Sequence, residues 1–334
     1  MFGLRRKKTA TGIHITDTQI KLVEIEGSSQ HVDVLQKHII GLEEGSIRNG
    51  KLVDEESVIH RLTQHVKARA LQGTPVHLTL PTSNVILRKS VLPALKDQEL
   101  RNMIDVELNG GSQVPFKNPV FDFVRLGPVP TEAAAAAETE VAKTKFQKQE
   151  SVLIFATPLE VVDSYSALIY KSGLAPVSVD IAPLAIFRIL AKQQQLSGAF
   201  LPKTFMFLQL ESEYADVSIF TEGIPVFMRS IQMNQGYAMD SGSEKTEVYG
   251  RNLNMELGRI LNYFQYSVST AQEEVDRIYL IGETEWTTSL IPSLESFFPG
   301  EIALFPLEQI LRARDSSIQA FTVPMGLALK GVIL

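Results

Sequence analysis

The sequence of 334 residues contains no cysteine. Disulfide bonds, thiol catalysis and thiolate zinc sites are therefore excluded. The sequence also lacks a run of 18 uncharged apolar residues that could span a bilayer, and it contains neither a P-loop nor a G-x-S-x-G elbow. Among its six histidines, His60 and His65 are five residues apart, not the four that place two metal ligands on one helix face. No catalytic residue and no metal site are predicted.

Excess positive charge is also missing. The chain has 32 basic and 38 acidic residues, a net charge of −6, which argues against a nucleic-acid-binding protein. One basic run, 5–8, lies in a predicted N-terminal tail, 1–11. Because 9–12 is not an apolar run, no secretory signal is predicted and a cytoplasmic protein is expected. The tail is expected to be solvated, with contact to anionic lipid as the alternative.

What is present is an alternation of strand and helix patterns. Segment 12–25 predicts strand, tight turn and strand, and 32–40 predicts a third strand. A helix begins at Asp54 and ends before Gly73, and 76–80 is a short strand. This order predicts a mixed sheet with a helix packed on it.

The same opening appears again after residue 205. Three further strands are predicted within 205–233, and the triplet 14–16 superposes on 209–211, 195 residues later. A long amphipathic helix at 248–268 follows. After it come a strand at 277–281, a helix at 289–298 and a closing helix at 324–331. The repeated opening predicts two related halves.

A separate α+β lobe is predicted between the halves, at 83–178. It contains a strand at 85–92, a helix starting at Asp97, a strand at 151–156 and a helix at 158–171. Segment 131–150 includes five consecutive alanines between charged residues, which favours a loose helix or a mobile hairpin tip.

Several short motifs, in order along the chain, carry a family resemblance. They are Gly12-Ile13-His14-Ile15 with Ile20 to Ile25, Gly50-Lys51-Leu52-Val53-Asp54, Leu80-Pro81, Asp97-Gln98-Glu99-Leu100, Val114-Pro115-Phe116, Phe121-Asp122-Phe123, Ser172 to Val177 with Val179-Asp180-Ile181, and Val275-Asp276-Arg277-Ile278. The chain resembles PilM, the actin-like protein of type IV pilus assembly and a relative of the cell-division protein FtsA.

This resemblance implies an α/β fold of the actin-like, duplicated ribonuclease-H-like class, with an inserted α+β lobe of the 1C type. The implied domains are the tail 1–11, core subdomain 1A at 12–82, the 1C lobe at 83–178, more of 1A at 179–202, the second half (2A/2B) at 203–302, and a return to 1A at 303–334.

The resemblance also implies a nucleotide site that this chain has altered. In actin-like proteins two glycine-containing hairpins hold ATP phosphates and an aspartate organises Mg²⁺. The corresponding positions here are His14, Thr16 and Asp17 in the first hairpin, Gln209 and Glu211 in the second, and Gly282 and Glu283 on the adenosine side. A carboxylate 4 Å from one phosphate charge costs about 4 kcal/mol at a dielectric constant of 20. We therefore expect neither ATP hydrolysis nor tight ATP binding. No cofactor is expected, and ATP with Mg²⁺ would bind only if the degenerate site still works.

The implied function is a non-enzymatic cytoplasmic scaffold of a type IV pilus-like, type II secretion or competence machine. It would bind the short cytoplasmic N-terminal peptide of a PilN-like single-span protein, and would be peripheral to the inner membrane through its partners. Candidate residues of the peptide groove are Pro81, Thr82, Ile86, Ile104, Pro115, Phe116, Asp180 and Ala182. Assembly ATPases and self-association are further candidate partners.

Nucleic acid is not an expected partner, and direct membrane insertion is not expected, because 326–334 is too short and has too little basic surface for an amphipathic membrane helix. The alternative hypothesis is an active ATP-binding protein of the FtsA or PilM type whose nucleotide state controls assembly.

Overall fold

The protein is divided into two compact units. Unit 1 comprises Met1–Ser83 and Ser164–Leu334, and unit 2 comprises Asn84–Asp163. The computed structural model describes residues 8–27, 31–110, 114–129, 149–198, 200–233, 244–269, 273–311 and 315–333. The alanine run of 131–150 therefore lies outside the described residues. The predicted tail 1–11 is too long, because the first strand already begins at Lys8.

The first sheet of unit 1 contains five strands. They are β1 (Lys8–Ile15), β2 (Gln19–Gly27), β3 (Val32–Gly41), β6 (Pro75–Leu80) and β10 (Ala175–Ile181), in the order β10-β6-β1-β2-β3. The β1–β2 and β2–β3 pairs are antiparallel, whereas β6 runs parallel to both β1 and β10. A two-stranded ribbon, β4 (Ile47–Arg48) and β5 (Lys51–Leu52), follows β3.

The second sheet of unit 1 repeats this topology. Its strands are β11 (Thr204–Leu210), β12 (Tyr214–Thr221), β13 (Ile224–Gln232), β14 (Arg277–Ile281) and β15 (Glu301–Leu304), in the order β13-β12-β11-β14-β15. Two antiparallel pairs are again followed by two parallel pairs. The prediction of two related halves is confirmed.

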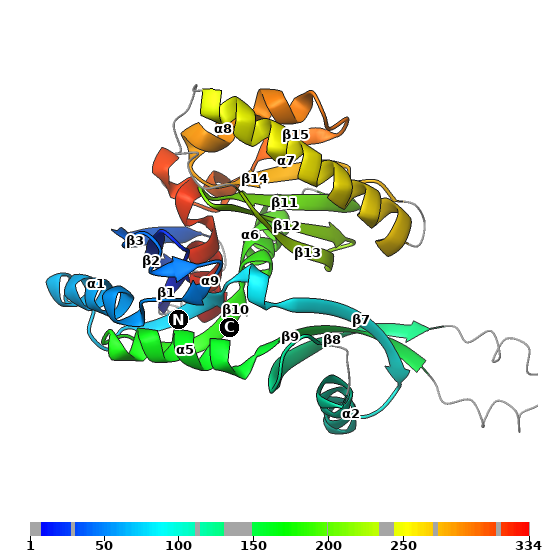
Figure 1. Cartoon of the computed structure of the whole chain (residues 1–334), viewed down its shortest axis with the longest axis horizontal. Helices are drawn as coiled ribbons and strands as arrows, with labels where there is room; N and C mark the ends of the chain where they lie inside the picture. The colour runs from blue at the N-terminus through cyan, green and yellow to red at the C-terminus, as the bar shows by residue number, and fades with distance from the viewer. Residues whose placement is uncertain are drawn as a thin grey trace, which may run out of the picture. The chain divides into compact units, whose positions relative to one another are not determined.

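Helices fill the space between the two sheets and cover their outer faces. The helices of unit 1 are α1 (Glu55–Ala68), α6 (Ala182–Ser197), α7 (Glu244–Tyr263), α8 (Thr284–Glu295) and α9 (Thr322–Ile333). The boundary between the units falls inside α5 (Leu159–Lys171), which belongs to unit 1 from Ser164 on. Helices α6 and α9 lie between the sheets (Figure 1), in a core that also contains Phe205, Phe207 and Phe220. Helices α7 and α8 cover the other face of the second sheet.

The strand β11 shows why the two cores form. Every residue of it is buried. Phe205 and Phe207 point into the core between the sheets, whereas Met206, Leu208 and Leu210 point into the core under α7 and α8. An apolar strand without polar alternation is the expected pattern for a central strand that is covered on both faces.

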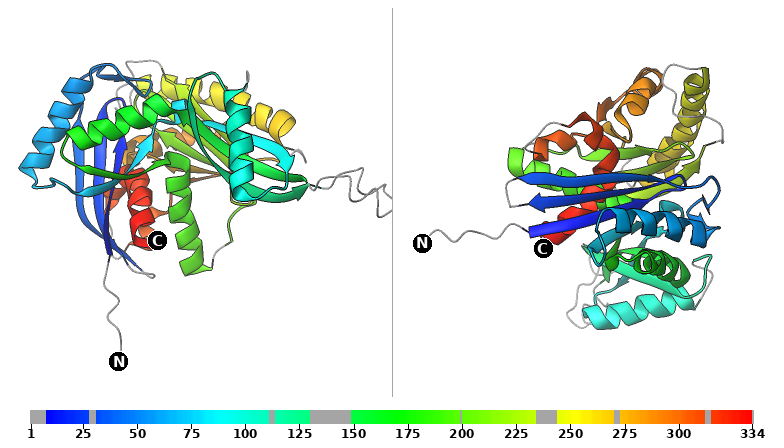
Figure 2. Two further views of the ribbon diagram at one scale, coloured as in Figure 1. Left: turned by 90° about the horizontal axis from the view of Figure 1, so that it is seen from below. Right: turned by 90° about the vertical axis from the view of Figure 1, so that its left-hand side faces the viewer.

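Two glycines allow α9 to approach its neighbours at backbone distance. A Cβ atom at Gly12 of β1 would lie 1.9 Å from the carbonyl oxygen of Pro324. A Cβ atom at Gly326 would lie 2.0 Å from the carbonyl oxygen of Ala185 in α6. The side chains of α9 are mostly buried, and the view on the right of Figure 2 shows α9 beside the strands of the first sheet. Within the described residues, no helix is both long and apolar enough to cross a membrane.

Unit 2 is a three-stranded antiparallel sheet with one helix. Strands β7 (Ile86–Pro93), β9 (Gln149–Pro158) and β8 (Pro119–Val129) are hydrogen-bonded in that order. Helix α2 (Asp97–Asn109) buries Leu100, Ile104 and Leu108 against residues of β9. A short 3₁₀ turn, Thr82–Asn84, precedes β7.

Three boundaries differ from the prediction. Unit 2 ends earlier than the predicted lobe 83–178, because β10 pairs with β6 and so belongs to the first sheet. Helix α8 begins at Thr284, five residues before the predicted start and two residues after Gly282, which follows β14. The predicted boundary at 302 falls inside β15, which pairs with β14 and therefore belongs to the second half.

Candidate functional site

The ends of the two central hairpins meet inside unit 1. His14 lies near the end of β1 and Gln209 near the end of β11, 195 residues apart in the chain. Gln209 Nε2 lies 3.3 Å from His14 Nε2, and both residues are buried. The two positions that superpose in the sequence are thus in direct contact across the two halves.

His14 is held as a neutral imidazole. Its Nε2 faces the amide nitrogen of Gln209, which donates, so its Nδ1 carries the proton and donates to Thr79 Oγ1 at 2.7 Å. Burial lowers the pKa of His14 to about 4, although Glu211 acts in the opposite direction. A neutral imidazole therefore occupies position 14, where the resemblance implies a carboxylate.

A buried ion pair joins the two halves next to this contact. Lys21, the β-bridge partner of His14 on β2, places Nζ 3.1 Å from Glu211 Oε1 and 3.3 Å from Oε2. The side chains of Lys21 and Glu211 are only 2% and 5% exposed. The carboxylate of the second hairpin is therefore the counter-ion of the lysine of the first.

The first hairpin turn closes without glycine. The Thr16 hydroxyl donates to the carbonyl oxygen of Gln19 at 3.0 Å and accepts from its backbone N–H at 3.1 Å. The backbone N–H of Thr16 donates to the same carbonyl at 2.9 Å. The residues of this turn have no positive φ, so Thr16 fits it without backbone strain.

The carboxylate of Asp17 is hydrogen-bonded to a neighbouring turn. Its carboxylate accepts the backbone N–H groups of Asn49 and Gly50, the latter at 3.0 Å. Asn49 and Gly50 have φ of 51° and 71°, as two-residue Asn-Gly turns between antiparallel strands require. This turn joins β4 and β5, and Tyr165 Oη donates to the carbonyl oxygen of Gly50 at 3.0 Å.

Gly282 and Glu283, the positions that the resemblance places on the adenosine side, connect β14 to α8. Gly282 has a φ of 149°, and a Cβ atom there would lie 2.8 Å from the carbonyl oxygen of Leu210. Glu283 occupies the N-cap position of α8 in an extended conformation, and its side chain makes no capping hydrogen bond. Glycine at 282 is therefore required by the close approach of the second hairpin, and its presence is no sign of a bound ligand.

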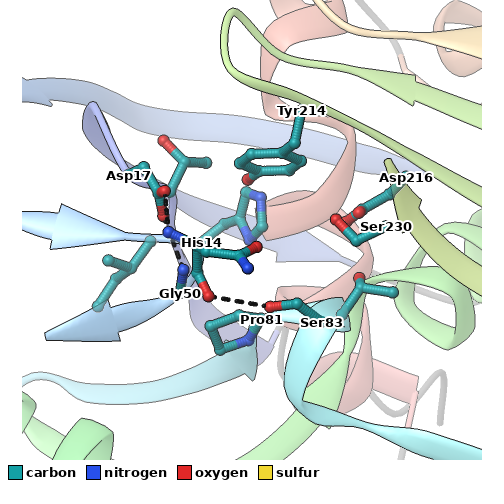
Figure 3. Close-up of a pocket in the computed structure, with 12 residues that line it drawn as sticks. His14, Asp17, Gly50, Pro81, Ser83, Tyr214, Asp216 and Ser230 are labelled. Atoms are coloured by element: carbon teal, nitrogen blue, oxygen red, sulfur yellow. Dashed lines mark hydrogen bonds between the residues drawn. The ribbon is translucent and has the colours of Figure 1, made fainter. Parts of the chain in front are cut away.

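A pocket remains beside the contact between the hairpins. Figure 3 shows Asp216 and Ser230 on one side and Asp17 with Gly50 on the other, with His14 and Tyr214 between them. Asp216 is 8% exposed. Burial raises the pKa of Asp216 to about 6, while the hydroxyls of Ser230 and Thr82 lower it and the charges of Glu211 and Asp17 raise it. Burial also raises the pKa of Glu213 and of Tyr214.

These residues do not fit a magnesium nucleotide. The described residues that line the pocket include no lysine and no arginine, and the charge of Lys21 is already matched by Glu211. Mg²⁺ prefers oxygen ligands, whereas position 14 offers a neutral imidazole. Phosphate groups would meet carboxylates at close range, an arrangement that Coulomb's law penalises.

The candidate groove residues divide between the two units. Pro81, Thr82, Asp180 and Ala182 belong to unit 1, and Ile86, Ile104, Pro115 and Phe116 belong to unit 2. Ile104 is fully buried in the core of unit 2 and Ala182 in the core of unit 1, so neither can meet a peptide from its present position. Asp180 is paired with Arg188 at 2.7 Å and with Lys330 at 3.4 Å. Pro115 is exposed, and Ile86 and Phe116 are partly buried.

Sequence reasoning missed several residues of the site, four of which matter most for its chemistry. Lys21, Thr79, Asn49 and Asp216 contact its predicted members or line the pocket. A signal existed for Asn49, because Asn-Gly between short strands is a turn signature, and for Lys21, a charged residue inside an apolar strand pattern.

Comparison with known proteins places this geometry in a family. The family model "Type IV pilus assembly protein PilM" matches residues 12–240. Among solved structures, a PilM-PilN type IV pilus biogenesis complex superposes with a TM-score of 0.73 at 21% identity, covering 97% of this chain and 98% of that chain. The ethanolamine utilization protein EutJ from Carboxydothermus hydrogenoformans superposes with a TM-score of 0.53 at 10% identity, covering 96% and 89%.

These structural likenesses establish the actin-like fold, in agreement with the duplicated sheets. No curated protein matches the chain at the level of sequence.

Proposed function

Because this chain belongs to the family of type IV pilus assembly protein PilM, we propose that it is a non-enzymatic scaffold of a type IV pilus-like assembly machine. It acts at the cytoplasmic side of the inner membrane by binding the N-terminal peptide of a PilN-like membrane protein. Its two halves stay joined without nucleotide.

One observation carries this proposal: the buried ion pair between Lys21 and Glu211. In a nucleotide-dependent clamp, the ligand bridges the two halves. Here a side chain of each half supplies that bridge, and the His14–Gln209 contact adds a second. A bridge of protein groups persists whatever the nucleotide concentration, which suits a structural role. The structural similarity to a PilM-PilN complex supports the choice of partner.

Thermal melting with and without magnesium ATP tests the nucleotide part. A ligand at 100 times its Kd adds about 2.7 kcal/mol to the free energy of unfolding. We expect the Tm of the wild-type protein to be the same in millimolar magnesium ATP and in EDTA. A rise of several degrees would instead support the alternative, an ATP-binding protein whose nucleotide state controls assembly.

Calorimetric titration tests the partner part. A synthetic peptide from the cytoplasmic N-terminus of a PilN-like protein should bind with the same Kd in EDTA and in magnesium ATP. Phe116→Asp should weaken binding at least tenfold, because an extended peptide bound in a groove depends on apolar pockets. The matched control is Val106→Asp on α2, where the side chain is 70% exposed.

Equal peptide affinity of the Phe116→Asp variant and the wild type would remove Phe116 from the binding surface. Failure of every tested peptide to bind would contradict the partner itself. Ile104→Asp is unsuitable as a test, because a charge at this fully buried position would disrupt the core of unit 2.

A further inference from the structure

The pocket beside the hairpin contact has the form of a binding site for a small ligand. It lies entirely within unit 1 and has an empty volume of about 340 Å³, part of it open to solvent. The part of it that a water-sized sphere can enter is about 20 Å³, room for one water molecule or one small ion. Its walls come from the first hairpin, the β4–β5 turn, residues 81–83, and the strands β12 and β13.

Two buried oxygens of this pocket make no hydrogen bond of normal distance and angle, although the Thr82 hydroxyl lies close enough to the Asp216 carboxylate to lower its pKa. They are Asp216 Oδ1 and Thr82 Oγ1, on residues that are 8% and 6% exposed. Figure 3 shows the carboxylate of Asp216 beside Ser230 at the edge of the pocket. Buried polar atoms in native proteins nearly always have a partner, since an unsatisfied group pays its full desolvation cost. A carboxylate oxygen and a hydroxyl oxygen together indicate a ligand that these oxygens can coordinate.

The charges around the pocket define the sign of that ligand. Asp17 already accepts two backbone N–H groups, and Glu211 is neutralised by Lys21. His14 is neutral, because its Nε2 accepts from Gln209. None of the described lining residues is a lysine or an arginine. Asp216 is therefore a carboxylate of this pocket without a countercharge among its lining residues, and one positive charge would balance it.

We propose that this pocket binds one monovalent cation, an alkali-metal ion or ammonium, through Asp216 Oδ1 and the hydroxyl oxygens of Thr82 and Ser230. Of the two carboxylates that line the pocket, Asp17 is engaged with two backbone N–H groups, so Asp216 supplies the single carboxylate ligand, and one such ligand with neutral oxygens matches a single charge. Divalent ions use several carboxylates or strict octahedral geometry, and the described residues contain no group of three or more His, Asp or Glu that could hold a metal ion. This inference is independent of the proposed scaffold role.

Thermal melting in different chloride salts tests the proposal. The wild-type protein is melted at pH 7.5 in equal concentrations of potassium, sodium, ammonium and tetramethylammonium chloride. Tetramethylammonium serves as the reference, because it cannot fit between these oxygens. We expect the Tm to be a few degrees higher in at least one of the three small cations. Asp216→Asn should lose this difference, whatever its own stability, and the control Glu295→Gln should keep it.

Three results would overturn the proposal. The first is the same Tm in all four salts. The second is an equal cation effect in the wild type and in Asp216→Asn, which would mean a general salt effect. The third, in a further melt with magnesium or calcium chloride added to the tetramethylammonium reference, is a rise in Tm with a divalent ion but with none of the three small monovalent cations.

A second measurement locates the ion and does not depend on a variant. Crystals of the full chain soaked in thallous acetate, in which Tl⁺ replaces K⁺, should show an anomalous peak in contact with Asp216 Oδ1 and Thr82 Oγ1. Peaks found elsewhere on the protein, with none in the pocket, would contradict the site. Thr82→Val should remove or weaken the peak while leaving the carboxylate in place.

Discussion

The two halves of unit 1 have the same topology but contribute different charged groups where they meet. The hairpin of the first half brings Lys21, a neutral His14 and Asp17 to the contact, whereas the hairpin of the second half brings Glu211, Glu213 and Asp216. The comparison shows how a duplicated fold can join its halves by itself: one half provides the cation and the other the carboxylate.

The second comparison concerns the packing of the central strands. The offset of 195 residues that relates His14 to Gln209 also relates Gly12 of β1 to Phe207 of β11. Gly12 lets α9 approach the first sheet at backbone distance, whereas Phe207 is fully buried in the core between the sheets. Equivalent positions thus serve close helix contact in one half and aromatic packing in the other.

The largest expected effect comes from breaking the charge complementarity. Lys21→Met leaves the carboxylate of Glu211 buried without its counter-ion, and should lower the free energy of unfolding by about 3–5 kcal/mol. The double variant Lys21→Met with Glu211→Leu should recover more than half of that loss, because an apolar pair of similar volume can replace a buried ion pair. Urea denaturation of the wild type, of the single variants Lys21→Met and Glu211→Leu, and of the double variant measures this coupling.

The matched control is the exposed pair Lys171–Glu55, whose side chains are 56% and 37% exposed. Lys171→Met should cost about 0–1 kcal/mol. Strictly additive losses in the Lys21 and Glu211 variants would show that the two residues do not interact energetically, and would remove the basis of the nucleotide-free bridge.

The packing difference between the halves predicts the next largest effect. Gly12→Ala should lower the free energy of unfolding by about 3 kcal/mol, because its Cβ atom would lie 1.9 Å from a carbonyl oxygen of α9 and the helix would have to shift. Gly41→Ala is the control, since a Cβ atom there meets nothing within 4 Å. Equal stability of the two variants in urea would mean that α9 does not pack on β1 as described.

The fold could be predicted from the sequence because it depends on local patterns. Strand alternation and the repeated opening at 205–233 were enough to identify two halves, and the offset between them is the one that brings His14 and Gln209 together. The boundaries near α8 and β15 were not predictable. Thr284 has no capping side chain before it that marks a helix start, and β15 is a strand of four residues defined by its pairing with β14.

The site was less predictable than the fold. The sequence itself shows that the hairpin glycines are lost, because Thr16 and Glu211 stand in their positions. The sequence does not show the ion pair between Lys21 and Glu211, because these residues are 190 positions apart and their pairing depends on how the two sheets pack. The position of Asp216 beside Thr82 likewise follows from tertiary structure alone.

The smallest expected effect is a pH dependence of opposite sign in two variants. Burial lowers the pKa of His14 to about 4 from a usual 6.5, so between these values the unfolded state binds more protons and stability falls as the pH falls. Burial raises the pKa of Asp216 to about 6 from a usual 3.8, so between these values the native state binds more protons and stability rises as the pH falls. In the wild-type protein the two contributions partly cancel.

Single variants should separate them. Between pH 7 and pH 5, His14→Gln should gain about 2 kcal/mol of stability relative to the wild type, and Asp216→Asn should lose about 1 kcal/mol relative to it. Urea denaturation at a series of pH values, in a buffer whose only cation is tetramethylammonium, measures both. Parallel pH profiles for the two variants would mean that the first hairpin does not hold a neutral base beside an acid of the second, and the charge asymmetry between the halves would then be limited to the ion pair of Lys21 and Glu211.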